Sequence, residues 1–200
     1  KGVIMTTKQT YKTGLGTSDA DSITLLGHDL ATEILGKYSF GELSYYLITK
    51  RRPTPGQLVM FEAVLASLAD HGFTPTAIAA RLTYASAPDS LQGALAAGLL
   101  GGGSRFLGVT EDCAHFLARE LKEIGAAPTT QDGWDAAALN AVQKQKDIGK
   151  FVPGLGHPVH KQGDPRTPVL MAMAREQGLF GSHLSLFEAI GRVHSQVLGK

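Results

Sequence analysis

One segment, residues 151–166, concentrates the residue types that could do chemistry. Its sequence, FVPGLGHPVHKQGDPR, sets two histidines, one lysine and one arginine among three glycines and three prolines. Glycine tolerates positive φ and close backbone approach, and proline fixes the chain, so such a segment can hold N–H groups and side chains around a bulky anion. His157, Lys161 and Arg166 could supply the donors. The pattern is equally typical of a rigid surface turn with solvated basic side chains.

The two histidines of this segment also raise the question of a metal site. His157 and His160 are three positions apart, and a carboxylate or thiolate would be needed to complete a ligand shell around them. The acidic residue within reach is Asp164, which lies beside Arg166. We therefore expect no metal here.

A second candidate is His71, in the sequence LADHG at residues 68–72. We expect it at the C-terminal end of a helix that Gly72 closes, where the helix dipole favours a charged imidazolium. Such a histidine could bind a carboxylate. From this segment alone, a simple C-terminal capping histidine is the better interpretation.

A third candidate is GGGSRFLG at residues 101–108, with four glycines between two expected helices. This density suggests a phosphate-binding loop, but the lysine of that loop and the G-x-G-x-x-G strand context are absent. The alternative is a close crossing of two helices through small residues.

Composition limits the class of protein. The chain has 200 residues, 18% charged and 43% apolar, and a formal net charge of +1, so neither nucleic-acid binding nor disorder is indicated. The single Cys113 excludes an internal disulfide framework, fits a reducing compartment and is expected to be a packed core thiol. The longest apolar runs fall well short of the ~20 residues that cross a bilayer. With no signal peptide visible at the N-terminus, we expect a cytoplasmic protein.

The elements that must position these residues are predicted to be helices. Ser39 and Glu42 form a capping box, and the pairs Thr54–Pro55 and Thr74–Pro75 are typical helix starts. Capping signals and apolar spacing predict eight helices, at about residues 39–49, 54–71, 74–84, 89–100, 110–124, 134–148, 167–177 and 182–198. An all-α protein follows. The last of these helices reaches the end of the sequence, so we expect the polypeptide to continue beyond Lys200.

Together these segments resemble the citrate synthase superfamily, and more closely its cleaving branch of citryl-CoA lyases and the C-terminal module of ATP-citrate lyase. The resemblance runs from about Ser18 to the end of the chain. LADHG is similar to the segment that supplies a histidine to the carboxylates of oxaloacetate or citrate, and GLGHPVHKQGDPR resembles the family signature G-x-G-H-x-V…D-P-R.

The resemblance implies roles for the candidate residues. His157 would contact the reacting carbonyl or hydroxyl, while His71 and Arg166 would bind carboxylates. The glycine turn formed by Gly154, Leu155 and Gly156, together with Lys161, would lie along coenzyme A. The family's catalytic aspartate and further arginines are expected after Lys200.

One departure from the family pattern points to cleavage. Citrate synthases carry a G-P-L-H-G-like segment whose histidine helps to enolise acetyl-CoA. This chain has GSRFLG instead, with Phe106, a candidate substrate-binding residue, at the position expected for that histidine. The same form is found in ATP-citrate lyase. The resemblance therefore implies a citryl-CoA lyase, which cleaves citryl-CoA to acetyl-CoA and oxaloacetate by a metal-free retro-Claisen reaction with no permanently bound cofactor. Two alternatives remain: a citrate synthase or 2-methylcitrate synthase that condenses an acyl-CoA with oxaloacetate, and a non-catalytic protein that binds coenzyme A or dicarboxylates.

The resemblance also implies an architecture. We expect a large helical domain whose N-terminal part is residues 1–108, and a smaller helical domain, residues 109–200, that carries the GLGHPVHKQGDPR loop. Family members are dimers, so a homodimer is expected, with no nucleic-acid or membrane partner. The helix at about residues 89–100, rich in Ala, Gly and Leu, suits such an interface or a plain intradomain core.

Overall fold

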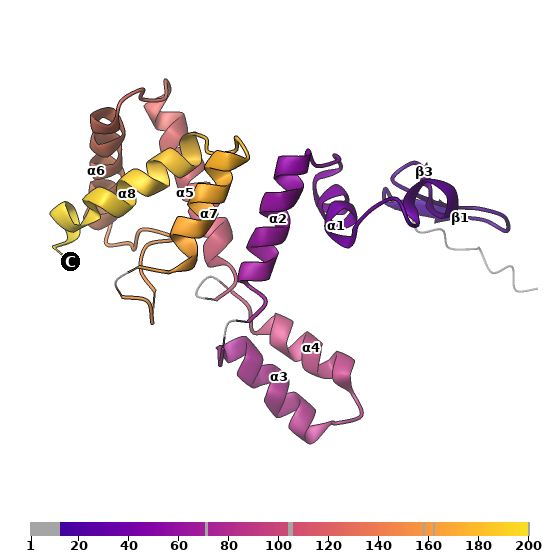
Figure 1. Ribbon diagram of the computed structural model, residues 1–200. Helices are drawn as coiled ribbons and strands as arrows, with labels where there is room; N and C mark the ends of the chain where they lie inside the picture. Colours follow the sequence, from indigo (N-terminus) through magenta and orange to yellow (C-terminus); the bar gives the residue numbers. More distant parts are fainter. Residues whose placement is uncertain (1–12, 71, 104–105, 158, 162, 200) are drawn as a thin grey trace, which may run out of the picture. The chain divides into compact units, whose positions relative to one another are not determined.

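The computed structural model describes residues 13–70, 72–103, 106–157, 159–161 and 163–199. These residues form eight α-helices, a π-helical turn and a small antiparallel sheet, which confirms the prediction of a mainly helical protein (Figure 1). The chain divides into two compact units, residues 1–62 and 63–200. The predicted boundary between residues 108 and 109 stays a prediction.

The described part of the first unit contains a small sheet, which the sequence did not predict. Its strands are β1 (Gly16–Ser18), β2 (Ile23–Leu25) and β3 (His28–Asp29), paired in the order β1-β2-β3. The turn between β1 and β2 is stabilised by the carboxylate of Asp19, which accepts the backbone N–H of Ser22 at 2.7 Å. The π-helical turn η1 (Leu30–Ile34) follows directly.

Two helices follow in the positions where capping residues predict them. Helix α1 (Phe40–Thr49) begins at Ser39, whose hydroxyl accepts the N–H of Glu42 at 3.1 Å. Helix α2 (Pro55–Ser67) begins with a reciprocal pair: Gln57 N donates to the Thr54 hydroxyl at 3.3 Å, and Thr54 N donates to the Gln57 side chain at 2.9 Å. These bonds satisfy N–H groups that have no partner within the helix.

The end of α2 differs from the prediction, because the helix stops at Ser67 rather than reaching residue 71. Beyond it, the carboxylate of Asp70 accepts the N–H of Gly72 at 3.1 Å, a local bond that competes with continuation of the helix. The predicted site residue His71 lies outside the described residues.

Helices α3 (Pro75–Ser86) and α4 (Leu91–Leu100) form a hairpin (Figure 1). They approach closely through small residues: a Cβ on Gly98 would lie 3.2 Å from the Cβ of Ala80 and 3.2 Å from the carbonyl oxygen of Thr76. The opposite face of α4 is exposed, with Leu91, Leu95 and Leu99 each more than 60% accessible.

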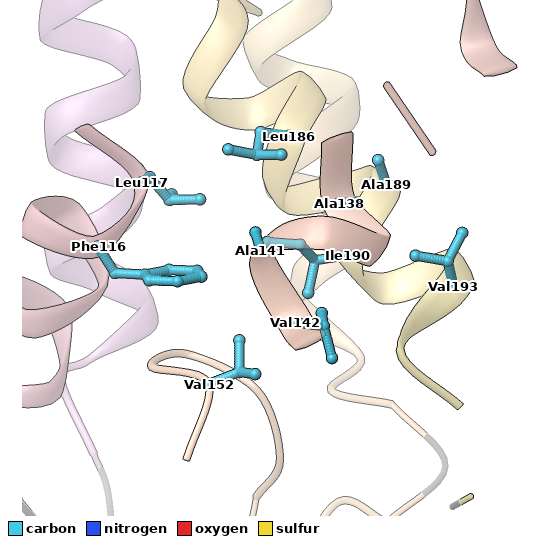
Figure 2. Packing of buried hydrophobic residues seen from close by; sticks show 10 residues of the cluster. All are labelled: Phe116, Leu117, Ala138, Ala141, Val142, Val152, Leu186, Ala189, Ile190 and Val193. Atoms are coloured by element: carbon cyan, nitrogen blue, oxygen red, sulfur yellow. The ribbon is translucent and has the colours of Figure 1, made fainter. Parts of the chain in front are cut away.

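The remaining helices are α5 (Val109–Ile124), α6 (Gln131–Asp147), α7 (Arg166–Glu176) and α8 (Ser182–Leu198). Helices α5, α6 and α8 enclose a continuous apolar core, in which Phe116, Val142, Leu186 and Ile190 are almost fully buried (Figure 2). The bounds of α8 are as predicted, whereas α6 begins three residues early because Thr130 caps it. None of the described helices is long and apolar enough to cross a membrane.

Candidate active site

The segment 151–166 is anchored to the core of the second unit at its start. Val152 is buried in the cluster between α5, α6 and α8 (Figure 2). Leu155 packs against the same cluster, and its N–H donates to the Val152 carbonyl at 3.1 Å. Phe151, the neighbour of Val152, is 92% exposed. The segment is therefore a fixed loop whose first residues alternate between core and surface.

Gly154 is required by the packing of this loop. Its φ is +82°, and a Cβ at this position would lie 2.7 Å from the sulfur of Cys113 and 3.1 Å from the ring of Phe187. A side chain would thus be strained and would also collide with α5 and α8. Cys113 lies half-buried beneath the loop, and burial raises the pKa of its thiol.

The imidazole of His157 is oriented by the turn that carries it. Its Nδ1 accepts the backbone N–H of Val159 at 3.1 Å and that of His160 at 3.0 Å. A nitrogen that accepts two hydrogen bonds carries no proton, so the neutral ring is protonated on Nε2. The turn therefore fixes the ring with Nδ1 as an acceptor and Nε2 as its donor.

His160, which the sequence analysis considered only as a metal ligand, lies against His157. The two ring centroids are 4.6 Å apart with an interplanar angle of 32°. Within the described ranges, one ligand atom each from His157, His160 and Asp164 lie within 4.8 Å of one another. These three residues could approach a metal ion, but both carboxylate oxygens of Asp164 accept from the Arg166 guanidinium, whose positive charge opposes a cation. The expectation of no metal stays a prediction.

Arg166 is the first residue of α7, and its guanidinium donates hydrogen bonds to two residues. Its Nε donates to Asp164 Oδ1 at 2.9 Å and its Nη2 to Asp164 Oδ2 at 2.6 Å, a side-on ion pair. Its Nη1 donates to the carbonyl oxygen of Ser67 at 2.9 Å. The guanidinium holds the pKa of the Asp164 carboxyl well below its ordinary value.

The other predicted site residues lie nearby in sequence or on a separate turn. Lys161 is exposed, and its N–H donates to the Val159 carbonyl at 2.9 Å. Phe106 lies between α4 and α5 in a tight turn, where Gly103 N donates to the Phe106 carbonyl at 2.7 Å and Phe106 N donates to the Gly103 carbonyl at 3.0 Å. The described contacts thus group His157, His160, Asp164 and Arg166, and they include none between Phe106 and this group.

A hollow of about 620 Å³ lies elsewhere in the second unit, between α5, the end of α6 and residues 148–153. It contains Glu120, which is 3% exposed and pairs with Arg119 at 3.0 Å and with Lys144 at 3.3 Å. Of the predicted site residues that the structure describes, none lines it. We therefore interpret the buried carboxylate as a structural ion pair rather than as part of the site.

The fold and the histidine loop define the class of protein. Residues 9–199 match the family model described as citrate synthase, C-terminal domain. The chain therefore belongs to the citrate synthase family, as the sequence motifs indicated. No match was found among curated proteins.

Solved structures of similar fold include enzymes of the cleaving branch. The chain is similar to citryl-CoA lyase from Hydrogenobacter thermophilus, with a TM-score of 0.81 and 30% identity over 96% of this chain and 70% of that chain. The chain is also similar to a mutant ATP citrate lyase from Methanosaeta concilii in complex with (3S)-citryl-CoA. The TM-score is 0.70 and the identity 25%, and the match covers 90% of this chain and 28% of that chain.

The fold is shared with a third, longer protein. ATP citrate lyase from Methanothrix soehngenii, in complex with citrate and coenzyme A, gives a TM-score of 0.78 at 24% identity and covers 96% of this chain and 30% of that chain. These comparisons support an enzyme of the citrate synthase family with similarity to citryl-CoA lyases.

Proposed function

We propose that this protein is a citryl-CoA lyase that cleaves citryl-CoA to acetyl-CoA and oxaloacetate. The observation that carries the proposal is the similarity of fold and sequence to a citryl-CoA lyase over 96% of the chain. The loop that holds His157 supports it, because a histidine fixed in one tautomer suits a reaction in which charge develops on a single oxygen.

The reaction breaks one carbon–carbon bond of the citryl unit. The electron pair of this bond passes to the thioester side and forms the enolate of acetyl-CoA. The citryl hydroxyl gives up its proton to a base as its oxygen becomes the ketone of oxaloacetate, and the enolate carbon takes up one proton from an acid, so no net proton is released. The reaction therefore needs a group that stabilises the oxygen and groups that hold the carboxylates.

His157 is our candidate for the group at the oxygen. With Nδ1 occupied by two backbone N–H groups, Nε2–H is the donor that the ring can offer to a ligand. A donor fixed before the substrate arrives needs no reorganisation as negative charge grows on the oxygen. Its contribution is to stabilise that oxygen while the hydroxyl proton leaves.

Arg166 and His71 are our candidates for holding carboxylates. Arg166 stands at the first position of α7, where the helix dipole also favours an anion. In the part of the chain that the structure describes, three of its five guanidinium N–H groups have acceptors, and a substrate carboxylate could accept from the other two. Gly154, Leu155, Gly156 and the exposed Lys161 would lie along coenzyme A, and Phe106 would contact the substrate.

The test is turnover of purified protein with citryl-CoA, followed through oxaloacetate in a coupled reduction. We expect turnover by the native chain and a loss of about 100-fold or more in kcat for His157→Ala, because one preorganised donor to a developing oxyanion is removed. His183→Ala, at an exposed histidine of α8, is the matched control and should keep full activity. Absence of turnover, or full turnover by His157→Ala, would contradict the proposal.

The same assay run backwards separates cleavage from synthesis. Supplying acetyl-CoA and oxaloacetate tests whether Phe106, in place of the expected histidine, permits enolisation. We expect no useful condensation. Rapid condensation would instead favour a citrate synthase, and binding of coenzyme A and oxaloacetate without turnover would favour a non-catalytic protein.

We also propose that two copies of the chain associate through the α3–α4 hairpin. Leu82 on α3 and Leu91, Leu95 and Leu99 on α4 are between 61% and 73% exposed. An apolar hollow of about 390 Å³ lies beside them, lined by Ala80, Arg81, Tyr84, Ala85, Leu91, Ala94 and Leu95. Leucines of this exposure beside an apolar hollow favour a buried interface, since clustered apolar surface is uncommon on monomers.

A further inference from the structure

Arg166 joins two segments that are far apart in the sequence. Its Nη1 donates to the carbonyl oxygen of Ser67, 99 residues earlier, at 2.9 Å. Ser67 is the last residue of α2, and carbonyl groups at a helix C-terminus lack partners within the helix. A guanidinium satisfies such a carbonyl, and its charge suits the negative end of the helix dipole. Arg166 is therefore a tertiary link as well as a candidate ligand for substrate.

Asp164 sets the orientation of this link. Both of its oxygens accept from the guanidinium, at 2.9 and 2.6 Å, and Oδ1 also accepts the backbone N–H of Arg166 at 2.9 Å. Pro165 stands between the two residues with φ of −62°, so the backbone that separates them is itself restrained. The side-on pair leaves the guanidinium plane little freedom to rotate.

We propose that Asp164 is a positioning residue that acts through Arg166. By fixing the guanidinium, Asp164 keeps the end of α2 bonded to Arg166, at the end of the loop that carries His157. The segment 68–70, which follows α2, is held with it. The catalytic part of this inference rests on the proposed function, in which residues of both segments contact one substrate. The mechanical part, a link between residues 67 and 166 that depends on Asp164, does not.

The surroundings of Asp164 fit this role. Its side chain is 21% exposed and that of Arg166 is 31% exposed, so water only partly screens the pair. The Asp164 carboxylate also lies within 4.8 Å of ligand nitrogens of His157 and His160. One carboxylate thus lies close to both the guanidinium and the histidine pair.

Hydrogen exchange at the end of α2 tests the link without any substrate. We expect Asp164→Asn and Arg166→Gln each to speed exchange of the amides of residues 66–70 by about tenfold, because a charge-assisted hydrogen bond to the helix end is lost. The double variant should show the same increase as either single variant, because the two substitutions break the same connection between Arg166 and Ser67. Arg166→Gln tests the link from its other end, so the result does not depend on one variant folding.

Glu188→Gln is the matched control. It removes the 2.6 Å ion pair between Arg175 of α7 and Glu188 of α8. This pair is distant in sequence from Ser67, so the substitution should leave exchange at residues 66–70 unchanged. Unchanged exchange in Asp164→Asn, or increases that add in the double variant, would overturn the inference.

Kinetics test the catalytic part. We expect Asp164→Asn to lower kcat/KM for citryl-CoA by about 10- to 100-fold, the loss typical of a small misplacement of binding groups, and to have little further effect in an Arg166→Gln background. Additive losses would overturn the role through Arg166. If the native chain turns over no citryl-CoA, the proposed function fails, while the exchange result still decides whether the link exists.

Discussion

The Nδ1 atom of His157 accepts the backbone N–H of His160 at 3.0 Å, so the candidate catalytic ring is held by the turn that follows it. The N–H of Val159 donates to the same atom. The orientation of the ring is thus a property of the loop backbone and exists before any ligand is bound.

This arrangement predicts the tautomer of His157. We expect nitrogen-15 NMR spectra of the neutral ring to show a proton on Nε2 and none on Nδ1, because Nδ1 is the acceptor. His157→Ala identifies the signals by their loss. A ring protonated on Nδ1 when neutral would contradict the structure of this turn.

The close packing beneath the loop predicts unequal effects of two similar substitutions. Gly154→Ala should destabilise the protein by about 2–4 kcal/mol, from unfavourable positive φ and from collision with Cys113. Gly156→Ala is the control: its φ is +90°, but no described atom lies within 4 Å of the added Cβ, so a loss of only about 1–2 kcal/mol is expected.

Urea unfolding of both variants measures this difference. In a Cys113→Ala background, the effect of Gly154→Ala should shrink toward that of Gly156→Ala, because the sulfur atom is gone. Equal effects of the two substitutions in the native background would show that packing beneath Gly154 is unimportant.

The Asp164–Arg166 pair predicts how stability depends on pH. The guanidinium lowers the pKa of Asp164 below its ordinary value of 3.8, so folding favours the ionised carboxylate. A carboxyl whose pKa is lower in the folded than in the unfolded protein stabilises the fold. This stabilisation is fully present above the pKa of the unfolded state, and it is lost as the pH falls from that pKa through the pKa of the folded state. The free-energy advantage of the native chain over Asp164→Asn should therefore be constant from about pH 5 to 7 and decline below about pH 4.

Unfolding of the native chain and of Asp164→Asn at several pH values measures this trend. In an Arg166→Gln background the decline should be largely absent, because the charge that lowers the pKa of Asp164 is removed. An advantage that grows as the pH falls would contradict the assignment.

The exposed leucines of α4 predict an effect on association. Leu95→Lys should convert a dimer into a monomer at micromolar concentration, because a charge would have to be buried in an apolar interface. Ile148→Lys is the matched control, since Ile148 is 60% exposed and Leu95 is 61% exposed, but Ile148 follows the end of α6. Light scattering after size-exclusion chromatography measures both. A monomeric native chain, or equal dissociation of both variants, would rule out this interface.

Features that depend on neighbours in the sequence were predictable. Ser39, Thr54 and Thr74 each cap the helix that they were expected to start, because a cap joins residues only three positions apart. The family was also predictable, because the motifs that carry the resemblance are short local segments, among them the loop that holds His157 and Arg166.

Features that depend on distant residues were not predictable in the same way. The bond from Arg166 to Ser67 spans 99 residues, and no local pattern indicates it. The sheet was missed because its strands are only two or three residues long, too short for an alternating apolar pattern. The end of α2 was placed too late because Gly72 looked like a helix stop, whereas Asp70 forms a separate turn before it.

The two faces of α4 carry different evolutionary constraints. A Cβ on Gly98 would lie 3.2 Å from the Cβ of Ala80, so α3 and α4 would have to shift slightly to accept it, and we expect position 98 to favour glycine. Leu91, Leu95 and Leu99 lie on the exposed face, so substitutions there would leave the packing of α3 against α4 intact and would act through the dimer interface that we propose. If the proposed interface exists, the choice of partner could therefore change by substitution of these leucines while the hairpin itself stays the same.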